Sequence, residues 1–210
     1  MLRLAASSFL AGLGLAAACL LSPAAAHAAA TVGQAAPAFT LIDTAGRSVS
    51  LADFKGRHVV LEWVNPGCPF VQKHYDAGNM QATQKGAIDR GVVWLAINST
   101  ATSARDYLAP AALAGWMGQH RAPVTATLMD ADGKAGRAYG ARTTPHMYVI
   151  DPQGRLVYAG AIDSRPTANV ADIKVATNHV NAALADALAG RPVATPVTQP
   201  YGCTVKYAPQ

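Results

Sequence analysis

The sequence has little of what marks several large functional classes. Its 17 basic and 12 acidic residues give a net charge of only +5, and the basic residues are scattered without runs. This distribution argues against nucleic-acid binding, which needs clustered positive charge. Glycine-rich phosphate loops are missing, so nothing indicates a nucleotide cofactor. The histidines have no metal-ligand spacing with the cysteines, so solvated or capping roles explain them better than a metal site.

Long apolar runs are confined to the N-terminus. Residues 1–28 carry one charged residue, Arg3, then an apolar run through Leu21, and end in Ala-His-Ala at Ala28. This order is typical of a secretory signal peptide, and the run is short and glycine-rich for a membrane span. We expect a periplasmic or secreted protein, cleaved near Ala29 and without stable membrane insertion. The alternative is a retained membrane anchor.

The part of the chain after residue 28 is long enough to form one domain with a hydrophobic core. We expect this domain to span residues 29–190. After Gly190 the composition changes, because prolines recur at 192, 196 and 200 without apolar periodicity. Residues 191–210 are therefore expected to form an extended, Pro-rich tail that carries Cys203.

The most informative stretch surrounds Cys68. The run from Val59 to Val64 predicts a buried strand, Pro66-Gly67 a break, and Pro69 the first residue of a helix. A cysteine at the start of a helix lies at the positive end of the helix dipole, which favours its thiolate. We interpret Cys68 as a nucleophile; the alternative is a small buried apolar residue.

The remaining pattern predicts strands alternating with helices and then a hairpin, which indicates an α/β sandwich with a mixed sheet. The expected elements are a hairpin around Gly46, a strand from Val59, a helix after Cys68 that is interrupted near Gly78 and resumes over Met80–Arg90, a strand over 92–98, helices over 102–120 and 134–139, strands over 147–150 and 156–160, and a helix over 170–188.

Taken together, these motifs resemble a thioredoxin-fold redoxin. The residues that carry the resemblance are Gly33, Pro37, Phe39, Phe54-Lys55-Gly56, Trp63, Cys68-Pro69, Tyr139-Gly140, Thr144-Pro145, Tyr148 to Asp151 and Gly154. The stretches 96–99, 160–166 and 202–206 further resemble the peroxiredoxin-like subgroup of the alkyl hydroperoxide reductase and thiol-specific antioxidant superfamily. The resemblance implies a thioredoxin-like three-layer sandwich, with a mixed central sheet flanked by helices and an N-terminal hairpin extension.

The resemblance also implies supporting residues around Cys68. Pro145, after Thr144, is expected to be the cis-proline that lies against the active cysteine and leaves a backbone edge where an extended peptide could add as a strand. Glu62 resembles the buried acid that accepts a proton beneath the cysteine; the alternative is an acid at the sheet edge. His146 could favour the Cys68 thiolate when charged.

Departures from the family pattern affect the expected activity. Val71 occupies the place of the second cysteine of a Cys-x-x-Cys motif. Leu61 and Asn65 stand where peroxiredoxins have a proline and a threonine, and Pro145 aligns with their arginine. Peroxidase activity is therefore the weaker expectation.

The cysteines of the predicted mature chain lead to three hypotheses about its function. Loss of the signal peptide removes Cys19 and leaves two cysteines, as a redox pair requires, and residues 192–200 could span about 25 Å toward Cys68. The first hypothesis is an exported thiol–disulfide oxidoreductase. Cys68 attacks a disulfide or an oxidised sulfur, Cys203 resolves the mixed disulfide, and an external reductant regenerates both thiols. The second is a thiol peroxidase acting through a sulfenic acid. The third is a redox-inert binding module with a structural Cys68–Cys203 bridge. Expected partners are thiols, disulfides or peroxide.

Overall fold

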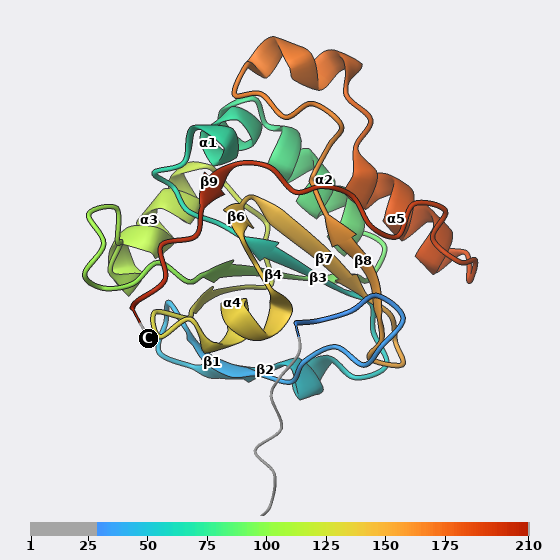
Figure 1. Ribbon diagram of the computed structural model, residues 1–210, viewed down its shortest axis with the longest axis horizontal. Helices are drawn as coiled ribbons and strands as arrows, with labels where there is room; N and C mark the ends of the chain where they lie inside the picture. The colour runs from blue at the N-terminus through green and yellow to red at the C-terminus, as the bar shows by residue number, and fades with distance from the viewer. Residues whose placement is uncertain (1–28, 210) are drawn as a thin grey trace, which may run out of the picture.

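A mixed seven-stranded sheet forms the middle layer of the molecule (Figure 1), with the strand order β2-β1-β5-β4-β3-β7-β8. The computed structural model describes residues 29–209, so the predicted signal peptide lies outside it. The strands are β1 (Thr40–Asp43), β2 (Ser48–Ser50), β3 (Val59–Trp63), β4 (Val93–Asn98), β5 (Ala126–Met129), β6 (Thr143–Thr144), β7 (His146–Ile150), β8 (Leu156–Gly160) and β9 (Cys203–Thr204). β6 and β9 form a separate two-stranded ladder.

The three central strands β3, β4 and β5 run parallel, and all other neighbours in the large sheet are antiparallel. β3 and β4 are buried along their whole length, as expected for parallel strands covered on both faces. The predicted N-terminal hairpin is present as β1 and β2.

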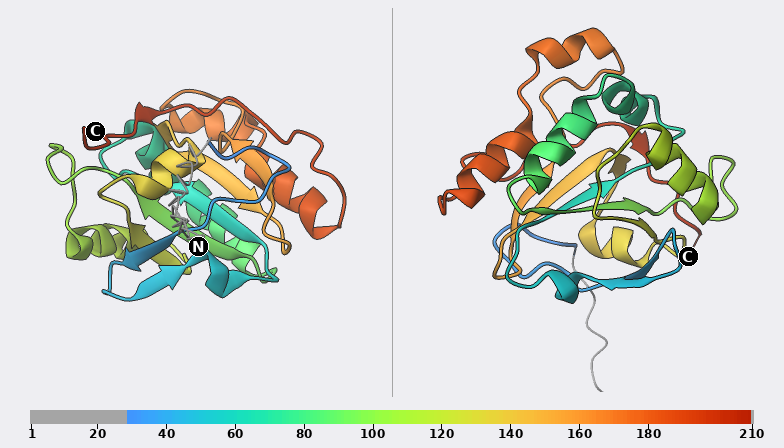
Figure 2. Two further views of the ribbon diagram at one scale, coloured as in Figure 1. Left: turned by 60° about the horizontal axis from the view of Figure 1, so that its bottom comes forward. Right: turned by 180° about the vertical axis from the view of Figure 1, so that it is seen from behind.

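Helices cover both faces of the sheet (Figures 1 and 2). They are α1 (Pro69–Asp76), α2 (Asn79–Ile88), α3 (Pro110–Gln119), α4 (Lys134–Tyr139) and α5 (His179–Leu188), with 3₁₀ helices η1 (Leu51–Phe54) and η2 (Val170–Val175). Helices α1, α2, α3 and α5 pack on one face, and α4 and η1 on the other. The predicted three-layer sandwich is confirmed.

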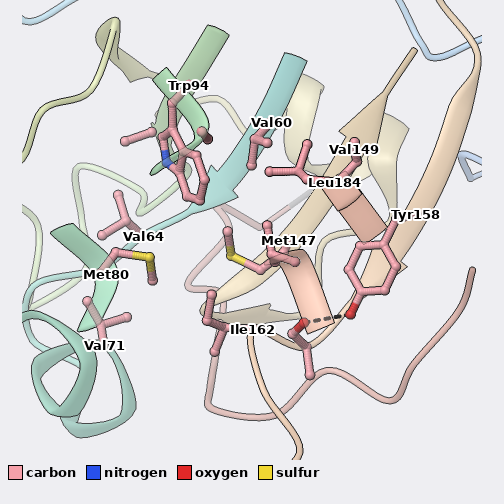
Figure 3. Close-up of a cluster of buried hydrophobic side chains, with 14 of the residues drawn as sticks. Val60, Val64, Val71, Met80, Trp94, Met147, Val149, Tyr158, Ile162 and Leu184 are labelled. Carbon is pink, nitrogen blue, oxygen red and sulfur yellow. Dashed lines mark hydrogen bonds between the residues drawn. The ribbon is translucent and has the colours of Figure 1, made fainter. Parts of the chain in front are cut away.

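Side chains alternate between the two faces along each strand, as the two-residue period of a strand requires. Val60, Trp94 and Met147 point toward α1, α2 and α5 (Figure 3), while Leu61 and Tyr148 point toward α4. Cys68 lies on the same face as α1, α2 and α5, so the candidate nucleophile is part of the hydrophobic core on that face.

Two expected helices are shorter than predicted. The helix expected over 102–120 begins only at Pro110, because proline disfavours a helical conformation in the residue before it and suits the first turn of a helix. The helix expected over 170–188 is divided into η2 and α5. Asn178 caps α5, since its side chain accepts a 2.9 Å hydrogen bond from the Asn181 amide.

The C-terminal segment returns from α5 across the edge of the sheet to β9, as Figure 1 shows in red. Val197 forms a parallel bridge with Ala159 of β8, and β9 then pairs with β6. This path brings Cys203 to the start of α1. Within residues 29–209, none of the helices has the length and apolar character needed to cross a membrane.

Candidate active site at the start of α1

Cys68 is the N-cap residue of α1, with extended backbone angles, and Pro69 occupies the first turn. The turn between β3 and α1 is fixed by Asn65. Its side-chain oxygen accepts a 2.8 Å hydrogen bond from the Gly67 amide, and its backbone oxygen accepts one of 3.0 Å from the Cys68 amide. The side-chain nitrogen of Asn65 donates to Asp106 at 2.7 Å, so the segment before α3 holds the turn from outside.

The sulfur of Cys68 lies between β6 and β9. Its thiol donates a 3.0 Å hydrogen bond to the carbonyl oxygen of Thr144, and the backbone amide of Cys203 donates to the sulfur at 3.4 Å. Cys68 is only 1% exposed. The tail therefore covers the sulfur and brings the second cysteine beside it. In the described part of the chain both cysteines are free.

The Thr144–Pro145 peptide bond is cis, as the resemblance implies. Thr144 and Cys203 are register partners in the antiparallel β6–β9 ladder, as are Thr143 and Thr204. The backbone edge beside the cis-proline, where an external peptide could add as a strand, is thus paired with the chain's own tail.

Cys203 is a poor nucleophile in this arrangement. Burial, together with its hydrogen bond to Cys68 and its electrostatic interaction with Cys68, raises the pKa of Cys203 to about 12. A thiol with this pKa is protonated at neutral pH, whereas the thiolate is the form that attacks. The two cysteines therefore differ in environment, and only Cys68 begins a helix.

Glu62 lies on β3 with no exposed surface, between β4 and β7, so the alternative of an acid at the sheet edge is wrong. Its carboxylate accepts hydrogen bonds from Tyr75 Oη at 2.8 Å, Trp94 Nε1 at 2.8 Å and Gln84 Nε2 at 3.0 Å. Burial raises the pKa of Glu62 against the opposing effect of these donors. Glu62 is therefore a buried acid that can bind a proton, and its hydrogen-bond partners Tyr75 and Trp94 belong to the same hydrophobic core as Cys68.

The expectation that a charged His146 favours the Cys68 thiolate is wrong. His146 is buried, and burial together with the charge of Arg142 lowers its pKa to about 3. Its Nδ1 lies 3.1 Å from Tyr148 Oη and accepts a hydrogen bond from the Arg142 amide. His146 is a neutral core histidine at physiological pH.

A buried polar group that the sequence analysis missed joins α1 to the tail. We call Lys73, His74, Asp163 and Tyr201 the anchor cluster. Tyr201 Oη donates to Asp163 Oδ1 at 2.5 Å and lies 3.1 Å from His74 Nε2. Lys73 Nζ lies 3.7 Å from Asp163 Oδ2 and donates to the carbonyl of Arg165 at 3.0 Å. Burial lowers the pKa of His74 to about 4, so Lys73 and Asp163 are the charged pair.

Across residues 29–209, no three histidine, cysteine or acidic side chains gather in a way that could hold a metal ion.

Comparison with known proteins places this site in a family. The chain matches the Redoxin family over residues 31–177. A hypothetical protein from Sinorhizobium meliloti 1021 has a similar structure, with a TM-score of 0.72 and 26% identity over 87% of this chain and 98% of that one. An uncharacterized conserved protein from Geobacillus kaustophilus gives 0.69 and 28%, over 86% and 94%. A search of the curated proteins finds no match.

A candidate thiol:disulfide interchange protein DsbE from Chlorobium tepidum shares the fold, with a TM-score of 0.50 and 23% identity over 62% of this chain and 85% of that one. The mixed sheet, its helical layers and the cis-proline beside the first turn of α1 agree with this likeness. The fold is therefore thioredoxin-like. Since the family match extends over more than half of the sequence, the chain belongs to the Redoxin family.

Proposed function

We propose that the protein is a thiol–disulfide oxidoreductase in which Cys68 is the nucleophile and Cys203 resolves the mixed disulfide. The observation that carries the proposal is the 3.4 Å contact between the Cys203 amide and the Cys68 sulfur, beside the cis peptide bond before Pro145. The position of Cys68 at the N-terminus of α1, next to Pro69, supports thiolate formation. Membership of the Redoxin family supports thiol chemistry in general.

The first step is attack of the Cys68 thiolate on one sulfur of a substrate disulfide. A bond forms between Cys68 and that sulfur, and the other substrate sulfur leaves as a thiolate and takes up a proton. In the second step Cys203 loses its proton and attacks the Cys68 sulfur. The substrate is released fully reduced, and Cys68 and Cys203 are oxidised to a disulfide. An external dithiol reverses this oxidation and regenerates both thiols.

The environment of Cys203 favours this order of events. Two of the four causes that raise its pKa are the hydrogen bond to Cys68 and the negative charge that Cys68 carries as a thiolate. Formation of a mixed disulfide removes that negative charge. Cys203 then becomes easier to deprotonate only after Cys68 has reacted, so the resolving step follows the attacking step.

We assign the remaining site residues supporting roles. Glu62, whose pKa is raised by burial, is proposed to accept and return the proton of the resolving step. Thr144 holds the Cys68 sulfur through its carbonyl, and Pro145 sets the direction of that carbonyl.

Peroxide reduction is the second candidate, because the 1% exposure of Cys68 favours a substrate small enough to reach a covered sulfur. Cys68 would attack the O–O bond and become a sulfenic acid, with release of water or an alcohol. Cys203 would then condense with the sulfenic acid and release water, which yields the same Cys68–Cys203 disulfide.

A side-by-side assay of residues 29–210 tests these functions. Disulfide reduction and hydrogen peroxide consumption are measured with the wild type, Cys68→Ser and Cys203→Ser. We expect disulfide reduction that Cys68→Ser abolishes and Cys203→Ser stalls at the mixed disulfide. Peroxide consumption alone would favour the second candidate. Neither activity, with a Cys68–Cys203 potential below about −300 mV, would make the pair a structural bridge instead.

We also propose that the protein acts after export, in the periplasm or outside the cell. The basis is the signal-peptide pattern of residues 1–28. Mass spectrometry of the protein from an exporting host should find a mature N-terminus near Ala29. An intact Met1 peptide in the membrane fraction would favour an anchor.

A further inference from the structure

Residues 196–206, which we call the strap, are bound to the domain on both sides of Cys203. Before Cys203, the Ala159 amide donates to the Pro196 carbonyl at 3.0 Å, and the Thr198 amide donates to the Ala159 carbonyl at 3.1 Å. After it, the Val205 amide donates to the carbonyl of Arg142 at 3.0 Å. The strap therefore lies over Cys68 as a continuous, hydrogen-bonded cover.

Tyr201 of the anchor cluster stands in the middle of this cover. Its hydroxyl contacts both Asp163 and His74, its ring lies 5.7 Å from Lys73 Nζ, and it packs against the ring of Phe70. The side chains of Lys73 and Asp163 are 0% and 2% exposed. A buried ion pair is costly to desolvate and is weak evidence for stability, but its fixed geometry can select one arrangement of the groups around it.

The position of the cluster indicates which arrangement it selects. Lys73 and His74 belong to α1, the helix that begins at Cys68, and Tyr201 lies two residues before Cys203. The cluster thus links the helix of the nucleophile directly to the strand that carries the second cysteine. An apolar residue in place of Tyr201 would bury surface but could not supply these bonds.

We propose that the strap is a gate over Cys68, and that Lys73, His74, Asp163 and Tyr201 are positioning residues that hold it closed. This gate restricts Cys68 to small disulfides or peroxides and excludes extended cysteine-containing peptides. The reason is that such a peptide needs the backbone groups of β6, and Cys203 and Thr204 already pair with them. The substrate restriction rests on the proposed function; the closed gate does not.

The first experiment uses Cys203→Ser as the parent, so that Cys68 is the one cysteine between residues 29 and 210. Two probes are compared: iodoacetamide, and an extended seven-residue peptide whose central cysteine carries thionitrobenzoate. Cys68 attacks the peptide sulfur and displaces thionitrobenzoate, which absorbs light on release. With Tyr201→Phe added, we expect labelling by iodoacetamide to accelerate, and the peptide reaction to accelerate more, by at least tenfold, because the peptide also needs β6.

Tyr139→Phe in the same parent is the matched control. Tyr139 is likewise a buried tyrosine whose hydroxyl donates one hydrogen bond, to the Pro37 carbonyl at 2.8 Å, and the aromatic rings that it packs against lie outside the strap. It should leave both rates unchanged. Equal acceleration in the two variants would mean general loosening and would overturn the gate, as would an unchanged iodoacetamide rate in Tyr201→Phe. Either result stands whatever the turnover assays give, so the gate and the proposed function can fail separately.

A measurement on the wild-type chain avoids any dependence on the folding of a variant. A gate must open without unfolding of the domain, so the amides of Cys203 and Val205 should exchange with solvent through local opening. We expect both to exchange at least tenfold faster than the amides of β3. Exchange of all these amides at one common rate would show that the strap opens only when the whole domain unfolds, which contradicts a gate.

Discussion

Gly202 lies so close to Thr144 that no side chain fits between them. A Cβ atom on Gly202 would overlap the carbonyl oxygen of Thr144, the same oxygen that accepts the hydrogen bond from Cys68. Gly202 also has φ +135°, in the region that side chains disfavour. The approach of β9 to β6 therefore depends on glycine at this position.

Gly202→Ala should push β9 away from β6 and move Cys203 from Cys68. We expect formation of the Cys68–Cys203 disulfide under a mild oxidant to slow by about 10- to 100-fold, since a shift near 1 Å can cost that much in an intramolecular reaction. Gly190→Ala is the control, because Gly190 has φ +68° but open space around it. The rate is followed by loss of free thiol. Equal rates in the two variants would contradict the role of the close approach.

The two cysteines should react unequally. Cys203→Ser is expected to accumulate one small-molecule thiol per chain on Cys68, because nothing resolves the mixed disulfide. In Cys68→Ser, burial still raises the pKa of Cys203, so its reaction with a disulfide reagent at pH 7 should be at least about tenfold slower than in the unfolded chain. Intact-mass spectrometry measures both. Rapid modification of Cys203 in folded Cys68→Ser would reverse the assignment of the nucleophile.

Glu62 should make stability depend on pH. Burial raises its pKa, so the folded state holds the proton more tightly than the unfolded chain does. By linkage, the wild type loses stability as pH rises from the ordinary value of 4.5 through the raised folded pKa. Glu62→Gln lacks this loss, so its free energy of unfolding relative to the wild type should increase across that range and then level off. Urea unfolding between pH 4 and 9 provides the test; a difference independent of pH would count against it.

Removing one charge of the anchor cluster should cost more than removing both. Asp163→Asn leaves the Lys73 ammonium buried without its partner, which should destabilise the fold by about 3–5 kcal/mol. Lys73→Met combined with Asp163→Asn should recover part of that loss. The exposed pair Lys85–Asp89 provides the control, and Asp89→Asn should cost about 0.5 kcal/mol or less. Chemical denaturation gives all three values, and a double variant less stable than Asp163→Asn alone would argue against coupling.

The central sheet and the turn at Cys68 could be predicted because their signals are local. β3 and β4 are uninterrupted apolar runs, and Pro66, Gly67 and Pro69 mark the end of one element and the start of the next. β5 has no comparable signal, because its four residues form no apolar run of similar length. The start of α3 differs from the prediction because the apolar residues before Pro110 resemble a helical pattern, while Pro110 disfavours a helical conformation in the residue before it.

Some features of the candidate site likewise have a local signal in the sequence, and others have none. The approach of Cys203 to Cys68 could be anticipated from a Pro-spaced segment of sufficient reach. The anchor cluster could not, because Lys73, Asp163 and Tyr201 are far apart in the sequence and a buried charged residue has no local pattern that separates it from an exposed one. The neutral state of His146 likewise depends on burial by residues that its own neighbourhood in the sequence does not reveal.

The pairing of Val197 with Ala159 also bears on how the protein avoids self-association. β8 is an end strand of the large sheet, and residues 196–198 occupy both backbone groups of Ala159. An uncovered strand edge is a template on which a second chain can add. A chain that ended before Pro196 would present the β8 edge to solvent and should tend toward edge-to-edge aggregation, a hazard unrelated to its thiols.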